Sequence, residues 1–184
     1  ISDAATVVDA DFTNVTNVEK LTGAAALTVT IGDVAQAAAL STISSAGALT
    51  LTIDKEYTSA LTLALVATND TITGTAYTGD LSITYAADNL DTNDTLIGGT
   101  GLNDSITVSG AGAVALAGTD LTNVSAFEKI IIGSDAGAAS VTLVEGNVAA
   151  GKALTVDATA LVSTNALTFV GTAETNGGIT VLGG

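Results

Sequence analysis

Apolar and small polar residues alternate along most of the chain, so that aliphatic side chains recur at every second position. This period of two is typical of β-strands with one buried face, and it is clear in "ALTVTI", "ALTLTI" and "DSITV". The sequence therefore predicts an all-β fold. The expected strands lie within residues 26–31, 48–53, 59–65, 70–74, 81–85, 94–98, 104–108, 128–132, 140–144, 153–157, 166–170 and 178–182.

The spacing of these segments is compatible with two β architectures. Many strand starts lie 10 to 13 residues apart, which suits either a sandwich or a solenoid with two strands per rung. In addition, "NDTITGTAYTGDLSITY" (69–85) matches "NDTLIGGTGLNDSITV" (93–108) at a shift of 24 residues. Self-similarity at a short fixed period is typical of repeat proteins. We therefore favour a parallel β-solenoid, of the β-helix or β-roll kind, over a sandwich.

A longer repeat is superimposed on the short one. "DFTNVTNVEKLTG" (11–23) returns as "DLTNVSAFEKIIIG" (120–133), and further matches pair "GALTLTI" with "KALTVDA" and "SALT" with "NALT". We expect a first module at residues 1–101, ending in acidic and glycine-rich turns, and a second, shorter copy at residues 102–184. The match places Phe12 on Leu121 and Leu61 on Leu167. Because the chain begins with Ile rather than Met, we also expect it to be a segment of a longer protein.

One segment departs from the strand pattern. In "GDVAQAAALSTISSAG" (32–47), Asp33 is a suitable helix cap, Gln36 can reach back to it, and Gly47 can end the helix. The second copy omits about nine residues here, since it reads only "GNVAAGKAL" (146–154). The sequence thus predicts one short helix near residues 33–46, inserted on the rungs.

Charge narrows the range of partners. The 184 residues include 4 Lys and no Arg against 19 acidic residues, for a net charge of −15. Such a surface repels phosphate, so we expect no nucleic-acid partner. Apolar runs are too short for a membrane helix, so we expect no membrane insertion.

The absent residue types also argue against an enzyme. With no His, Cys or Arg, catalytic triads, thiol nucleophiles and arginine clamps are unavailable. Paired carboxylates can cleave glycosidic bonds, but only six aromatic residues are present to stack on a sugar. The repeated pairs Glu19–Lys20 and Glu128–Lys129 are expected to be structural, and Asp3, Asp9 and Asp11 to be surface charge.

The stretch "TNDTLIGGTGLNDSITV" (92–108) concentrates the residue types that bind hard cations. On rungs of 24 residues, Asp70 lies under Asp94 and Asp80 under Asp104, about 4.8 Å apart. Like charges at that distance repel by roughly 3 kcal/mol at an effective dielectric of 20. Each pair must then splay into water, protonate or share a cation, for which calcium is suited because it takes six to eight oxygens.

The alternative is that these residues only form solvated turns. The candidate metal-ligating residues are Asp70, Asp80, Asp88, Asp91, Asn93, Asp94, Gly99, Gly101, Asn103 and Asp104.

The same stretch resembles a known calcium-binding repeat. "IGGTGLNDSI" (97–106) is similar to the glycine- and aspartate-rich nonapeptide of RTX (repeats-in-toxin) proteins, whose β-rolls bind calcium in the turns. "NDTL" (93–96) resembles the end of one such repeat, and Gly98, Gly99 and Gly101 open the next. An extra residue, Leu102, leaves either Asn103 or Asp104 in the ligand position.

The composition has a resemblance of its own. The Ala-, Thr- and Gly-rich, acidic, sulfur-free chain resembles surface-layer proteins and large type I secreted adhesins of Gram-negative bacteria, as do "TNVEKLTG" and "TNVSAFEKIIIG". The resemblance implies an extracellular, cell-surface protein that folds on calcium and is part of a surface-layer lattice. Its partners would be further copies or neighbouring domains of the parent chain, with a cell-surface polysaccharide as a further candidate. The alternative is the stalk or a binding module of an RTX adhesin.

Overall fold

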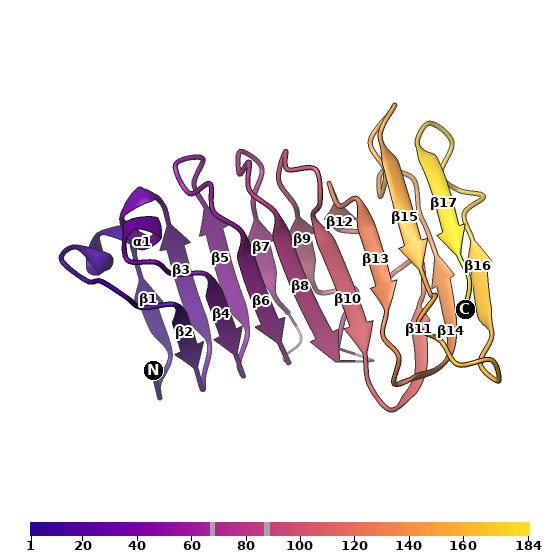
Figure 1. Ribbon diagram of the computed structural model, residues 1–184, viewed down its shortest axis with the longest axis horizontal. Helices are drawn as coiled ribbons and strands as arrows, with labels where there is room; N and C mark the ends of the chain where they lie inside the picture. Colours follow the sequence, from indigo (N-terminus) through magenta and orange to yellow (C-terminus); the bar gives the residue numbers. More distant parts are fainter. Residues whose placement is uncertain (67–68, 87–88) are drawn as a thin grey trace.

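The computed structural model describes residues 1–66, 69–86 and 89–184, and its strands form three parallel sheets (Figure 1). The six-stranded sheet has the order β1 (Ala5–Val7), β3 (Leu27–Ile31), β5 (Leu49–Ile53), β7 (Thr71–Thr73), β9 (Thr95–Ile97) and β12 (Val124–Ser125). The eight-stranded sheet has the order β17 (Gly178–Leu182), β15 (Ala153–Asp157), β13 (Lys129–Ile132), β10 (Ser105–Ser109), β8 (Leu81–Ala86), β6 (Leu61–Leu65), β4 (Thr42–Ser45) and β2 (Lys20–Gly23). The three-stranded sheet has the order β11 (Gly112–Leu116), β14 (Ala136–Thr142) and β16 (Leu167–Val170).

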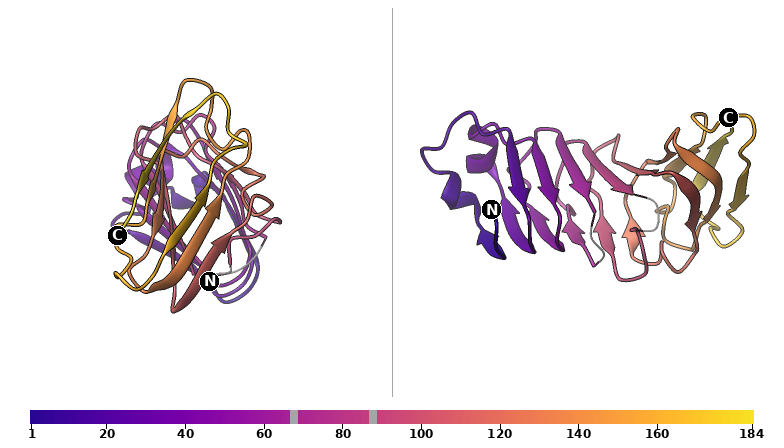
Figure 2. Two further views of the ribbon diagram at one scale, coloured as in Figure 1. Left: turned by 90° about the vertical axis from the view of Figure 1, so that its right-hand side faces the viewer. Right: turned by 90° about the horizontal axis from the view of Figure 1, so that it is seen from below.

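The chain winds between these sheets as a parallel β-solenoid, which confirms the predicted fold. Successive strands fall mostly on alternate sheets, and the two termini lie at opposite ends of an elongated body (Figures 1 and 2). Thr71 pairs with Thr95, as the 24-residue repeat predicts. Other rungs differ in length, from 20 residues between Thr62 and Ser82 to 28 between Leu96 and Val124.

Columns of stacked aliphatic side chains form the core. The inward positions of the eight-stranded sheet place Ile43, Leu63, Ile83, Ile106, Ile130 and Val156 in one register, and all six are buried. Burying a side chain of this size contributes about 1.5–3 kcal/mol. Because strand side chains alternate between faces, the intervening Thr and Ser residues face outward. The period of two in the sequence therefore becomes the inside and the outside of the solenoid.

All twelve predicted strands are present, but the predicted helix is largely wrong. Helix α1 (Asp33–Ala37) begins where expected and ends at Ala37 rather than near residue 46, with Ala39 in the left-handed region at a φ of 72°. The rest of the predicted helix is β4, whose alternating Ile43 adds a rung to the core. Nor does Gln36 reach back, since its Oε1 accepts N–H bonds from Thr58 and Ser59. A short 3-10 helix, η1 (Asp9–Phe12), was not predicted.

The duplicated module corresponds only in its first part. Strands β2 and β13 both lie in the eight-stranded sheet, and Phe12 and Leu121 are both buried ahead of them. Leu61, however, lies in the eight-stranded sheet and Leu167 in the three-stranded sheet, so their predicted superposition is wrong. The nine or so residues missing from the second copy include the counterpart of β4. Because the second copy lacks this strand, each of its later strands lies on the opposite face of the solenoid from its counterpart in the first copy.

Candidate functional site in the acidic turns

The acidic candidate residues lie in turns on two different edges of the solenoid (Figure 1). Asp70 and Asp94 precede β7 and β9, where the chain enters the six-stranded sheet. Asp80 and Asp104 precede β8 and β10, where it enters the eight-stranded sheet. Asp88 lies outside the described residues. The structure therefore separates the candidates into two sets instead of gathering them at one site.

Asp70 and Asp94 stack on neighbouring rungs, as predicted, but their side chains turn inward and are fully buried. Asp94 accepts the backbone N–H of Asp70 at 2.7 Å on one oxygen and that of Asp91 at 2.8 Å on the other. Asp70 accepts the N–H of Leu49 at 2.6 Å and the hydroxyl of Tyr85 at 3.1 Å. Each carboxylate oxygen thus holds a donor from the protein itself.

The predicted stacking of Asp80 under Asp104 is wrong by one residue. Ser105 pairs with Ser82, which places Asp104 over Leu81. Asp104 is buried and accepts the N–H of Leu81 and that of Gly99, both at 2.7 Å. Asp80 instead lies beside Asn103, whose amide nitrogen is 3.3 Å from the Asp80 carboxylate oxygens. The register shifts because the glycine-rich turn after β9 connects the two sheets with one residue fewer than the corresponding turn after β7.

Two glutamates continue this arrangement: Glu128, which was expected to be structural, and Glu174, which the sequence did not single out. Glu128 accepts the N–H of Asp104 at 2.9 Å, and Glu174 accepts that of Val148 at 3.2 Å. In each case a turn carboxylate bonds the backbone of the preceding rung. We call Asp70, Asp94, Asp104, Glu128 and Glu174 the carboxylate ladder. For Glu128, the signal in the sequence was the repetition of the Glu–Lys pair at residues 19–20 and 128–129.

Burial raises the pKa of four of the five ladder carboxyls, whereas at Glu174 hydrogen bonds from backbone N–H groups outweigh burial and lower the pKa. Desolvation raises the pKa of Asp70 to about 6, against the opposing effect of its bonds from Leu49 and Tyr85, and the nearby Asp94 charge raises it further. Burial likewise raises the pKa of Asp94, of Asp104 and of Glu128. These carboxyls are therefore easier to protonate than solvated ones, because water is excluded from around their charge.

Other candidate residues also have structural partners. Asp91 accepts bonds from the backbone and the amide nitrogen of Asn93, which close a local turn. A Cβ on Gly99 would lie 2.4 Å from the Tyr77 carbonyl oxygen, and one on Gly101 would lie 2.4 Å from that of Gly79. These glycines are required because successive turns approach one another closely.

Asp9, expected to be surface charge, accepts the N–H groups of Gly32 and Ala35 at 2.7 and 2.8 Å. It therefore fixes the start of α1 and is structural.

The described candidate side chains are not gathered into one acidic cluster. Within residues 1–66, 69–86 and 89–184, no three Asp, Glu, His or Cys side chains converge on a point that could hold a metal ion. The inward aspartates already accept N–H and O–H donors, whereas calcium requires six to eight oxygens directed at it. Among the predicted ligands, Asp80, Asp91 and Asn103 are less buried and lie on the outside of the turns.

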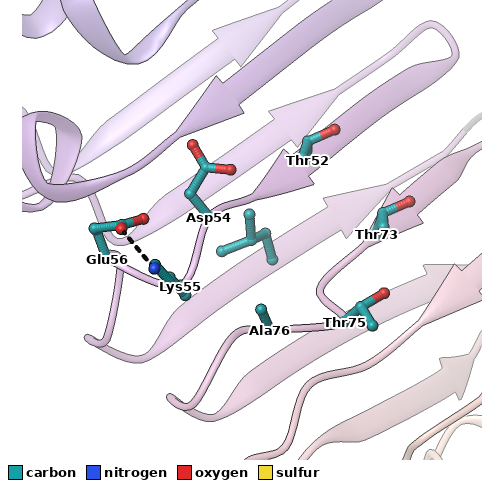
Figure 3. A pocket seen from close by; sticks show the side chains of 8 residues that line it. Thr52, Asp54, Lys55, Glu56, Thr73, Thr75 and Ala76 are labelled. Carbon is teal, nitrogen blue, oxygen red and sulfur yellow. Dashed lines mark ion pairs between the residues drawn. The ribbon is translucent and has the colours of Figure 1, made fainter.

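Among the hollows in the described part of the chain, two lie between successive turns. The larger, of about 340 Å³, is open to solvent and lies between the turns that follow β5 and β7 (Figure 3). Its ion pair, Lys55 with Glu56 at 3.6 Å, is largely exposed, with side-chain exposures of 73% and 50%. The smaller hollow, of about 120 Å³, lies between Gly99, Phe127 and Lys152. Both are gaps between stacked loops, and the exposed Lys55–Glu56 pair of the larger one contributes little to stability.

Comparison of the chain with protein-family models, with curated proteins and with solved structures gives no match in any of the three. No helix in the described parts of the chain is long and apolar enough to cross a membrane. Any function must therefore be inferred from the fold and from the side chains themselves.

Proposed function

We propose that the chain is a structural segment of a secreted, calcium-stabilised cell-surface protein and forms part of a surface-layer lattice. The observation that carries the proposal is the use of the carboxylate ladder. Acidic residues that would serve as acids, bases or ligands in an enzyme are buried or half-buried and bonded to backbone N–H groups. These carboxylates instead accept hydrogen bonds that connect one rung to the next.

The outer surface supports the same role. The outward positions carry mostly Thr and Ser, and the net charge of −15 keeps a chain of this hydrophobicity soluble outside the cell. Calcium, which the resemblance implies, would be held by outward oxygens such as those of Asp80 and Asn103, because the inward aspartates already have donors. In a lattice, such outward carboxylates would also face neighbouring copies.

One observation favours a second candidate function, an adhesin stalk. The termini lie at opposite ends of the elongated body (Figure 1), so the chain passes through the solenoid from end to end. This geometry suits a spacer that holds a distant domain away from the cell. A stalk and a lattice segment share the same rungs and differ in whether their sides associate.

Electron microscopy and light scattering of the purified segment, with calcium and then with chelator, distinguish the two. A lattice segment forms ordered sheets with calcium, and chelator disperses them. A segment that stays monomeric at every calcium concentration contradicts the lattice proposal and leaves the stalk. Turnover of a polysaccharide or peptide that is lost on replacing one Asp or Glu contradicts both.

A further inference from the structure

Threonines form a regular grid on the outer face of the six-stranded sheet. Strand pairing aligns one column over five successive strands and a second column over three, two residues further along. The first column is Thr6, Thr28, Thr50, Thr71 and Thr95, and the second is Thr30, Thr52 and Thr73. All eight are exposed or half-buried, and we call them the threonine face.

The grid has two fixed repeats. Neighbouring parallel strands lie about 4.8 Å apart, and outward positions two residues apart on one strand are separated by about 6.6 Å. Figure 3 shows Thr52 and Thr73 on adjacent strands, with both side chains pointing to the same side. In the described part of the chain, none of the eight hydroxyls bonds to another protein atom. On the eight-stranded sheet, by contrast, Ser105 bonds to Ser82.

The threonine face also lacks charge, although the chain carries 23 charged residues. Strands β1, β3, β5, β7 and β9 contain no Asp, Glu or Lys. The outer face of the eight-stranded sheet, in contrast, carries Lys20 in β2 and the ion pair of Lys129 with Asp157 at 2.7 Å. The two faces of one solenoid therefore offer different chemistry to a partner.

These properties exclude most classes of partner. An uncharged face has nothing with which to hold phosphate or anionic lipid. Sugars and nucleobases are commonly held by aromatic stacking, yet all six aromatic residues lie elsewhere. A protein interface has an apolar centre, and among the aligned outward positions only Ile97, at the end of the second column, is a large apolar residue.

An ordered lattice of water molecules is a partner that matches an uncharged face of regularly spaced hydroxyl groups. Each Thr hydroxyl both donates and accepts, as a water molecule does. The methyl groups between the hydroxyls restrict the orientation of neighbouring water. The two repeats of the grid are comparable to the oxygen repeats on a face of hexagonal ice. The register of the parallel strands presents all eight groups on one face of the sheet, so little ordering is needed on contact.

We propose that the threonine face binds ice. Adsorption takes place through the hydroxyls of the two columns, without chemical change and without a metal. The inference goes beyond the structural role proposed above and does not depend on it, since lattice formation is tested by calcium and ice binding is not.

Partition into slowly growing ice tests the proposal. Fluorescently labelled segment is placed around a cooled surface, and its concentration is measured in the ice and in the remaining liquid. The wild-type segment is expected to be enriched in the ice. Thr50→Lys, in the middle of the first column, is expected to be excluded into the liquid. Thr62→Lys, also at an exposed position and with the same charge change on the eight-stranded sheet, is expected to keep the enrichment.

Circular dichroism establishes that each variant is folded, and Thr28→Lys tests the same column if Thr50→Lys does not fold. Exclusion of the wild-type segment from ice overturns the proposal, as does equal loss of partition in Thr50→Lys and Thr62→Lys. Retention on crystalline cellulose or chitin without partition into ice also overturns it, in favour of a polysaccharide partner.

Discussion

Replacing the buried Asp70 by Asn tests whether burial or hydrogen bonding dominates the carboxylate ladder. The side chain is fully buried and holds the Leu49 N–H on one oxygen and the Tyr85 hydroxyl on the other. An Asn of the same shape keeps the bond from Leu49 through its amide oxygen. Its amide nitrogen can donate to the Tyr85 oxygen instead. The substitution therefore removes the ionisable group while both contacts survive.

The size of the effect follows from the pKa. Folding raises the pKa of Asp70 from its usual 3.8 to about 6, so the native state holds this proton more tightly than the unfolded state. The resulting stabilisation is complete below about pH 4, falls as the pH rises towards 6 and is lost above it. A difference of this size corresponds to about 3 kcal/mol. Asp70→Asn, which cannot ionise, should match the wild type at about pH 4 and exceed its stability by up to about 3 kcal/mol at about pH 7.

Urea unfolding followed by circular dichroism at several pH values measures this difference, with the surface variant Asp3→Asn as the control. Subtracting the wild-type curve removes the titration of the other carboxyls. The reasoning is refuted if Asp70→Asn is less stable than the wild type at neutral pH by an amount that does not change with pH. That result would mean that folding leaves the pKa of Asp70 unchanged, because the ionised carboxylate gains as much from its two donors as it loses by burial.

Three further predictions concern the turns, the core and calcium. Gly98→Ala should destabilise the protein by about 1–3 kcal/mol in urea unfolding, because its Cβ would lie 1.9 Å from the Ala126 carbonyl oxygen. Gly112→Ala, with nothing within 4 Å, should not, and equal losses would contradict the argument. Ile72→Ala should cost about 2–5 kcal/mol as a core cavity, and a smaller loss would mean that the rungs collapse around it. Calcium should raise the melting temperature more than magnesium, and Asp80→Asn should reduce that gain. A melting temperature that chelator leaves unchanged would contradict this last expectation.

The strands could be predicted because alternation is a local signal. Segments such as "LTVTI" and "LTLTI" fix which side chains turn inward, and the 24-residue match fixes the pairing of Thr71 with Thr95. Strand β4 was missed because the preceding Ala-rich segment favours a helix, and propensity yields to the gain from burying Ile43. Strand β11 (Gly112–Leu116) was missed because its Gly and Ala residues barely alternate.

The candidate site was predictable in position but not in orientation. The sequence showed that Asp70 and Asp94 would stack, and it showed their repulsion. It could not show that a backbone N–H of the rung before would lie within reach of each carboxylate, since that depends on the turn geometry. The one-residue slip at Asp104 had no local signal either, because Gly98 and Gly101 permit several turn paths. The metal role of these residues stays a prediction.

The carboxylate ladder has a direction along the chain, and that direction bears on folding. Each backbone N–H that bonds from one rung to a ladder carboxylate of the next precedes that carboxylate in the sequence, as Leu49 precedes Asp70 and Asp70 precedes Asp94. A chain that emerges N-terminus first presents each of these N–H groups before its partner exists. Every completed rung is then the template for the next, and the next rung supplies the acceptor that the last one lacked. A chain cut between a donor and its acceptor leaves that N–H unpaired, at about 1–3 kcal/mol if it stays buried.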